Sequence, residues 1–154
     1  MLSDGALIKI QHIRSKYQDA RSCLLPSLHV VQEENGWISP AAMEAVGELL
    51  SVPKATVKGV STFYSMFSHR PMGRHLIQLC TNVACMVMGA DSLVDSLRKK
   101  YGLEPNGTTA DGRFSLVIME CIGACGTAPV MLVDTDLHDN INENTLLTTL
   151  GKYT

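Results

Sequence analysis

Four of the five cysteines stand in two close pairs, and a thiol can bind a soft metal, form a disulfide or carry out redox chemistry. Cys80 and Cys85 enclose four residues in the stretch CTNVAC, and Cys121 and Cys125 enclose three in CIGACGTAP. These pairs could form disulfides, act as a redox dithiol, bind zinc or hold an iron–sulfur cluster. Cys23 stands alone in an apolar helical stretch, and we interpret it as a small core residue.

The spacing of the thiols favours one of these possibilities. In a reducing cytoplasm, clustered cysteines bind metal or do redox work more often than they form structural disulfides. A thioredoxin-type dithiol is normally C-x-x-C, and structural zinc sites usually use short C-x-x-C knuckles, whereas both gaps here are longer. No histidine lies near either pair, which weighs against a Rieske centre and a mixed Cys/His zinc site. A binuclear iron–sulfur cluster on four thiolates fits best, with zinc as the alternative.

The residues around the four cysteines are mostly small or apolar. Gly123 and Gly126 let backbone N–H groups approach a bound centre. Low polarity and the nearby Glu120 both disfavour adding an electron to an anionic cluster, so we expect a low reduction potential. We expect an apolar coat around the thiols from Val83, Ala84, Met86, Val87, Met88, Ile122, Ala124 and Met131.

The elements that must position these thiols are strands followed by loops. HLIQL (75–79), RFSLVIM (113–119) and PVMLVD (129–134) have the composition of strands. A helix is predicted over 90–102 and another over 142–154, capped at its start by Asn142. The order strand, helix, strand, strand, helix predicts a small α/β domain with a mixed sheet. If the first two strands are parallel neighbours, the loops after them leave one edge of the sheet and bring the two pairs of thiols together.

The part of the chain before residue 70 predicts helices. Gly36 is placed to stop one of them, while Ser39 and Pro40 suit the N-cap and first position of the next. Pro26 requires that its helix begin there or bend. The predicted helices are ALIKIQHIRSKY, LPSLHVVQEENGW, SPAAMEAVGELL and a short one from Pro53 to about Gly59.

An aromatic segment and a boundary follow these helices. STFYSMF (61–67) is interpreted as a hydrophobic seam joining the helical part to the rest, with a docking surface for a partner as the alternative. SHRPMGR (68–74) has the proline, glycine and charge of a domain boundary. We therefore predict a helical domain, 1–70, and an α/β domain, 71–154.

The composition suits a packed globular protein: 154 residues, 45% hydrophobic, 18% charged, with a net charge of −2. RKK (98–100), at the end of a predicted helix, complements the helix dipole, and with no aromatic company it predicts no nucleic-acid partner. No apolar run approaches the roughly 20 residues that cross a bilayer, and MLSDGALIKI lacks the features of a targeting peptide. We expect a cytoplasmic chain with no direct membrane insertion.

The chain also lacks the sequence patterns of a substrate site. It contains neither the glycine-rich dinucleotide fingerprint nor the P-loop pattern, and no nucleophile, base and orienting group stand out. A cluster without a substrate site indicates that the chain passes electrons within a larger assembly.

Three stretches, GVSTFYSMF, GRHLIQLCTNVACMVMGA and CIGACGTAPVMLV, resemble the thioredoxin-like [2Fe-2S] subunit of the NADH-dehydrogenase module of respiratory complex I. The resemblance covers nearly the whole chain. It implies a thioredoxin-like [2Fe-2S] domain over 71–154 with an N-terminal helical bundle. Matched position by position, Cys80, Cys85, Cys121 and Cys125 correspond to the cluster ligands of the family.

The resemblance also implies partners. The main one is a flavin-bearing, NADH-oxidising subunit, which alone carries the FMN and NADH and exchanges single electrons with the cluster. Other subunits of the hydrophilic arm complete the assembly, and a bacterial origin on the peripheral arm is implied. Related subunits serve soluble NAD-linked hydrogenases and formate dehydrogenases. Two rivals stay open: a structural zinc module and a thiol–disulfide oxidoreductase on a thioredoxin-like fold.

Overall fold

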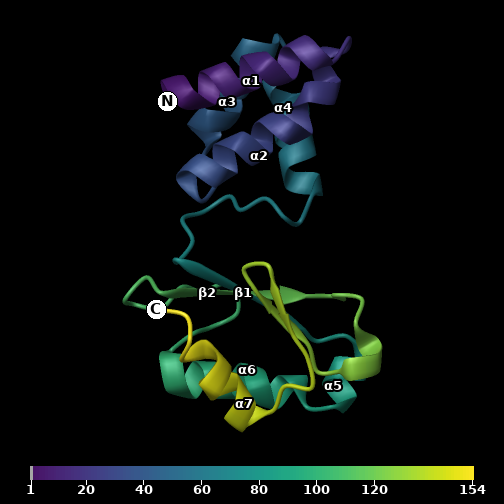
Figure 1. Ribbon diagram of the computed structural model, residues 1–154, viewed down its shortest axis with the longest axis vertical. Helices are drawn as coiled ribbons and strands as arrows, with labels where there is room; N and C mark the ends of the chain where they lie inside the picture. The colour runs from purple at the N-terminus through teal and green to yellow at the C-terminus, as the bar shows by residue number, and fades with distance from the viewer. Residues whose placement is uncertain (1) are drawn as a thin grey trace. The chain divides into compact units, whose positions relative to one another are not determined.

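The computed structural model describes residues 2–154. The chain divides into two compact units, Met1–Pro71 and Met72–Thr154, each with its own hydrophobic core. The first unit is built from helices and the second contains a sheet flanked by helices, as Figure 1 shows. Within residues 2–154, no helix is long and apolar enough to cross a membrane.

The helical unit confirms the helices predicted from the sequence, with boundaries set by local capping. The Ser39 side chain accepts a hydrogen bond from the backbone N–H of Ala42 at the start of one helix. Gly36, in the left-handed conformation with φ 75°, ends the helix before it. The elements are α1 (Asp4–Lys16), η1 (Ala20–Cys23), α2 (Leu24–Asn35), α3 (Pro40–Leu50) and α4 (Lys54–Phe63).

Two helix boundaries differ from the prediction. Helix α2 begins at Leu24, so Pro26 lies in its first turn, where the missing N–H costs no intrahelical bond. Helix α4 continues past the expected end at Gly59 to Phe63. A glycine inside a helix costs about 1 kcal/mol relative to alanine, and the packing of the buried residues on α4 outweighs that cost.

The aromatic segment after α4 does not form one buried seam, so that interpretation was wrong. Phe67 is buried and its ring centroid lies 5.0 Å from that of His29. Phe63, in contrast, is 80% exposed. The reason is helical geometry: Phe63 lies about 200° around the helix from the buried Ser61, which faces the core.

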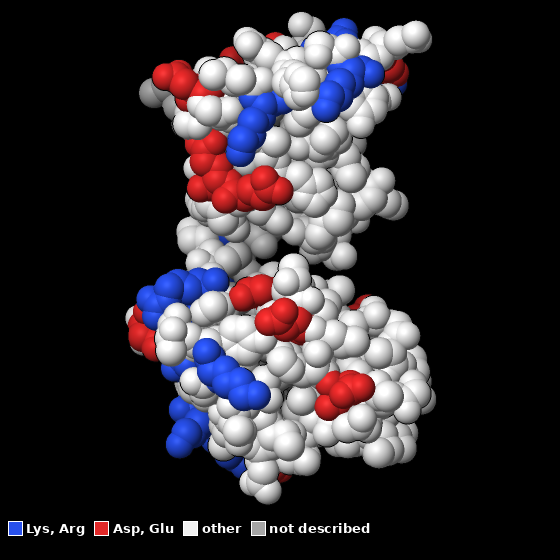
Figure 2. Space-filling model, in the orientation of Figure 1, with Lys and Arg blue, Asp and Glu red and all other residues white. Residues whose placement is uncertain are grey.

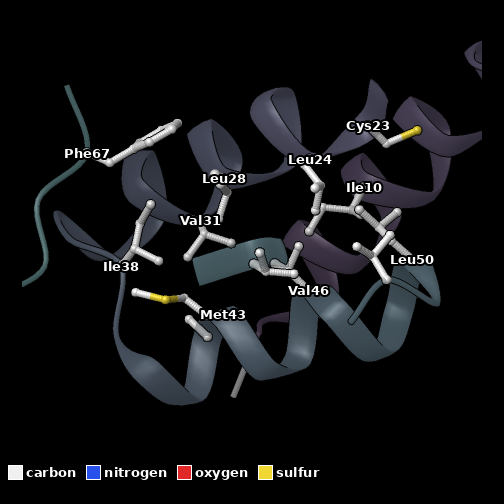
Figure 3. Packing of buried hydrophobic residues seen from close by; sticks show 13 residues of the cluster. Ile10, Cys23, Leu24, Leu28, Val31, Ile38, Met43, Val46, Leu50 and Phe67 are labelled. Atoms are coloured by element: carbon white, nitrogen blue, oxygen red, sulfur yellow. The ribbon is translucent and has the colours of Figure 1, made fainter. Parts of the chain in front are cut away.

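The core of the helical unit lies between its helices. Figure 3 shows side chains of α2 and α3 pointing toward one another, among them Leu28 and Val46, both fully buried. Cys23 is also fully buried there, and its Sγ lies 3.7 Å from the carbonyl oxygen of Asp19. The interpretation of Cys23 as a small core residue is therefore confirmed.

Replacing Leu28 with alanine is expected to lower the free energy of unfolding of the helical unit by about 2–5 kcal/mol, because it leaves a cavity in a closed core. Trp37, the only tryptophan, lies in this unit, so its fluorescence during denaturation reports on the unit. Ile8→Ala is the matched control, since Ile8 is 67% exposed and should cost less than about 0.5 kcal/mol. Equal losses in the two variants would contradict the predicted core.

The second unit contains a four-stranded mixed sheet with the strand order β2-β1-β3-β4. Strand β1 pairs in parallel with β2 and antiparallel with β3, and β3 pairs antiparallel with β4. The predicted parallel neighbours are thus confirmed, and the prediction missed only β4, which is too short to show a period. The strands are β1 (His75–Cys80), β2 (Phe114–Met119), β3 (Met131–Val133) and β4 (Asp136–His138).

Three helices accompany the sheet: α5 (Val83–Val87), α6 (Ala90–Tyr101) and α7 (Glu143–Leu150). Helices α6 and α7 lie on the same side of the sheet in Figure 1, and their leucines form one core with the buried residues of β1, β2 and β3. Asn142 caps α7 in a capping box with Thr145, as its position predicted. The α/β fold with helices is confirmed, while α5 was missed because one turn of helix carries little periodic signal.

The C-terminal residues are tied back to the sheet. The Arg113 guanidinium donates hydrogen bonds to the carbonyl oxygens of Tyr153, at 2.6 Å, and Leu150, at 3.0 Å. The Tyr153 hydroxyl donates to Asp136 at 2.9 Å. Burial, the hydrogen bond to Asp136 and the nearby carboxylates together raise the pKa of Tyr153 to about 12.

This raised pKa predicts a loss of stability in alkali. An unfolded tyrosine ionises near pH 10, whereas the folded chain keeps Tyr153 protonated to about pH 12. The stabilisation is therefore present below about pH 10 and is lost between about pH 10 and pH 12. Unfolding by denaturant across this range should show a steeper fall for the wild type than for Tyr153→Phe. An equally steep fall in both would contradict the assignment.

Candidate metal centre

The parallel pairing of β1 and β2 brings the two cysteine-bearing segments to one edge of the sheet. Cys80, the last residue of β1, stands opposite Met119, the last residue of β2. The chain then continues from β2 through Glu120, whose carbonyl oxygen lies 3.8 Å from the Cys80 Sγ, to Cys121. The register of the strands therefore places the first thiol of each pair at the same end of neighbouring strands.

The second thiol of each pair is placed by the segment that follows. Cys85 lies in the middle of α5, whose N-cap Asn82 accepts a hydrogen bond from the backbone N–H of Val83. Cys125 begins the short helix η2 (Cys125–Thr127), and its Sγ lies 3.9 Å from the Cys121 Sγ. Two thiolates on one tetrahedral ion at about 2.3 Å lie roughly 3.8 Å apart. The Cys121–Cys125 pair thus has the separation of two ligands on one ion.

The four thiols influence one another's ionisation. Burial opposes ionisation of Cys80, but a backbone hydrogen bond at Asn82 and interactions with Cys85 and Cys121 outweigh it and lower the Cys80 pKa. Burial raises the pKa of Cys85, and Cys80 adds to the rise. Cys121 raises the pKa of Cys125 through a hydrogen bond and charge repulsion. A positive metal centre among the thiols would relieve this repulsion and favour all four thiolates.

The two pairs of thiols differ in access to solvent. Cys80 and Cys85 are each 1% exposed, whereas Cys121 and Cys125 are both exposed free thiols. The buried thiols share a small apolar cluster with Ala90, Ala128 and Val130, against which Ala84, Ile122 and Ala124 pack. The site is therefore closed on the α5 side and open on the side of the second loop.

The predicted apolar coat is confirmed only in part. Ala84, Ile122 and Ala124 do pack against the buried thiols. Met131 is wrong, because it points into the core between the sheet and its helices. The predicted coat is also wrong for Val83, Met86, Val87 and Met88, which are 68%, 49%, 75% and 62% exposed.

These four exposed residues form what we call the α5 surface. Because Cys85 faces inward, Val83 and Val87 lie on the opposite side of the single helical turn. Figure 2 shows the part of this unit where α5 lies in Figure 1 as mostly white, while Lys and Arg side chains gather on the other side. A groove of about 660 Å³ beside it is lined by residues that include Val87, Met88 and Cys125.

The sequence contained a signal for this surface that was not used. Asn82 is a favourable N-cap, and Val83 and Val87 stand four residues apart on either side of Cys85. A turn of helix with a buried cysteine must turn those two valines outward. The apolar coat was predicted instead because all the neighbouring residues were assumed to face the thiols.

The donor set fits a binuclear iron–sulfur cluster held by four thiolates. The structure brings the four predicted cysteines to one edge of the sheet as two pairs, one buried and one exposed. Among residues 2–154, no three His, Cys, Asp or Glu side chains converge closely enough to hold a metal ion as they stand. The assignment of the four cysteines as ligands stays a prediction.

Comparisons with known proteins agree with this arrangement. Residues 10–154 match the family described as thioredoxin-like [2Fe-2S] ferredoxin. The chain is 36% identical over 153 residues to a subunit of the NADH-quinone oxidoreductase of Pseudomonas aeruginosa, covering 99% of this chain and 92% of that protein. It is 35% identical over 144 residues to the subunit of the same name in Escherichia coli, covering 94% of this chain and 87% of that one.

A solved structure shows the same fold. An NAD+-reducing [NiFe]-hydrogenase in the air-oxidized state matches with a TM-score of 0.72 at 22% identity. The match covers 84% of this chain but only 22% of the hydrogenase chain. At this level of identity the likeness concerns the fold alone.

Proposed function

The chain belongs to the thioredoxin-like [2Fe-2S] ferredoxin family, and from this premise we propose that it is the electron-carrying [2Fe-2S] subunit of a bacterial NADH-quinone oxidoreductase (complex I). The family resemblance expected from the cysteine motifs is thereby confirmed. One structural observation carries the proposal: parallel strands β1 and β2 end in register, and each is followed by a pair of cysteines.

We assign Cys80, Cys85, Cys121 and Cys125 as the ligands. When bound, a [2Fe-2S] cluster accepts and releases one electron. The strand ends and α5 hold Cys80 and Cys85 in fixed positions, and the apolar residues around them exclude water from that side. Cys121 and Cys125 come from a loop and leave the opposite side open, which is where an electron can enter or leave.

The open side supports a docking site for the flavin-bearing, NADH-oxidising subunit. The exposed Cys125 lines the same groove as Val87 and Met88, so a partner seated on the α5 surface would also cover the exposed thiol. Covering four exposed apolar side chains is favourable at about 25 cal/mol per Å² of apolar surface buried. We place the FMN and the NADH site on that partner, and the whole assembly on the peripheral arm of the membrane-associated complex.

We further propose that residues 1–70 act as a helical domain and 71–154 as the cluster-binding domain. The likeness to the hydrogenase chain supports a second candidate function, the equivalent subunit of a soluble NAD-linked hydrogenase. Both functions require the same cluster and the same flavin-bearing partner. They differ in what the rest of the assembly oxidises or reduces.

The proposal is tested by iron and acid-labile sulfide analysis of the full-length chain purified without air, together with EPR spectra before and after reduction by dithionite. We expect equal amounts of iron and sulfide and a signal that appears only on reduction. Zinc without sulfide would contradict the electron-transfer function and make the same site structural.

A further inference from the structure

The exposed pair of thiols has a property that the buried pair lacks. Cys121 and Cys125 are open to solvent and their Sγ atoms lie 3.9 Å apart. A disulfide requires about 2.05 Å between the sulfurs, so the pair must close by a little under half of its separation. Cys80 and Cys85, each 1% exposed, are close to other thiols but out of reach of a dissolved oxidant.

The backbone between the exposed thiols can make this adjustment. Residues 121–124 lie outside strands and helices, and Gly123 has a φ of 91°. A side chain built at Gly123 or Gly126 would meet nothing within 4 Å, so neither position is packed against a neighbour. In contrast, Cys80 belongs to β1, where its N–H donates to the Val130 carbonyl at 3.1 Å.

We propose that Cys121 and Cys125 form a reversible thiol–disulfide site in the cluster-free chain, which reacts with small disulfides of the glutathione class. One of the two thiolates attacks the small disulfide, forms a mixed disulfide and releases one thiol. The second cysteine then attacks the mixed disulfide, forms the Cys121–Cys125 bond and releases a second thiol. Two cysteines are oxidised, one small disulfide is reduced, and the two cysteine protons pass to the two thiols released.

The pairing follows from reach and tethering. The small disulfide can contact only the exposed thiols, so the first bond forms on Cys121 or Cys125. The partner that resolves it is the other member, because both stand on one short loop, whereas Cys85 is enclosed by the helix α5 and its apolar neighbours. The reaction therefore ends in an intraloop bond and leaves the buried pair as thiols.

The bond has a consequence that rests on the proposed function. If Cys121 and Cys125 bind the cluster, a loaded chain has no free thiolate at either position and resists the small disulfide. The bridge then protects the two exposed thiols from further oxidation only while the chain waits for its cluster, and a dithiol reductant restores them.

The test uses the full-length chain in two forms, cluster-free and cluster-loaded, each treated with oxidised glutathione. Free thiols are alkylated after unfolding, and peptides are identified by mass spectrometry. In the cluster-free chain we expect a peptide in which Cys121 and Cys125 are linked, with Cys80 and Cys85 alkylated, and full reversal by dithiothreitol. A bridge that includes Cys80 or Cys85, or a mixed disulfide that never closes, overturns the proposal.

Two variants sharpen this result. Cys125→Ser should stop at a stable glutathione adduct on Cys121, while Cys85→Ser should form the bridge as the wild type does. Loss of two thiols in Cys125→Ser would show that Cys121 pairs elsewhere and would overturn the proposal. The cluster-loaded chain should remain unmodified. If it forms the bridge while keeping its visible absorbance, the bridge stands and the ligand assignment of the two cysteines falls.

Discussion

Replacing Cys85 with serine is expected to leave the chain with at least about ten-fold less bound iron and sulfide than the wild type. Even changes behind the ligands of a metal site cost about 10–100-fold in affinity, and the serine hydroxyl is a poor ligand for iron that prefers thiolate. At 1% exposure, the position also leaves no room for water to take the place of the sulfur. The same result is expected for Cys80, Cys121 and Cys125. The measurement is iron and sulfide content per chain, with the visible spectrum.

Cys23→Ser is the matched control for this prediction. It makes the same chemical change at a fully buried cysteine, but in the core of the helical unit. The variant should bind a full complement of iron and sulfide, even if the helical unit is less stable. A result in which Cys23 is essential and one of the four other cysteines is dispensable would show that the ligand assignment is wrong.

Val87→Glu is expected to weaken binding of the chain to the flavin-bearing subunit by about thirty-fold or more. Val87 is 75% exposed on the α5 surface and would be covered by the proposed partner. Burying an unpaired carboxylate there costs about 2 kcal/mol or more, which corresponds to about thirty-fold in the dissociation constant. Calorimetric titration of the two purified subunits measures the change, and an unchanged cluster spectrum shows that the variant is folded.

The control for this surface is Leu137→Glu. Leu137 is 52% exposed, apolar and in the same unit, but it lies on β4 and does not line the groove beside α5. It should leave the dissociation constant within about two-fold, as most surface substitutions away from a contact do. Equal weakening by both variants would mean that the charge acts from a distance and that the α5 surface is not the docking site.

Several parts of the fold could be predicted from local sequence. Helix caps such as Ser39 and Asn142 were identified because a cap depends on residues within one turn. Strands β1 and β2 were identified by composition, and their parallel pairing followed from the helix between them. The prediction missed α5 and β4, because elements of five and three residues carry too little periodicity.

The position of the aromatic segment and of the predicted coat could not be obtained in this way. Whether Phe63 or Met86 is covered depends on which face of a short helix meets a neighbour. Apolar composition does not distinguish a core residue from one on a binding surface, because both are apolar for the same energetic reason. For these residues the sequence supports the presence of apolar side chains and no more.

The sequence by itself therefore determined the chemistry of this protein: four thiols, their spacing, and strands that end just before or at the first thiol of each pair. These features depend on residue type and short-range order, which are explicit in the chain. Only the tertiary structure decided that Cys80 and Cys85 are buried, that Cys121 and Cys125 are open, and that α5 turns its valines to solvent. Exposure is set by packing between segments far apart in sequence, so no local pattern can report it.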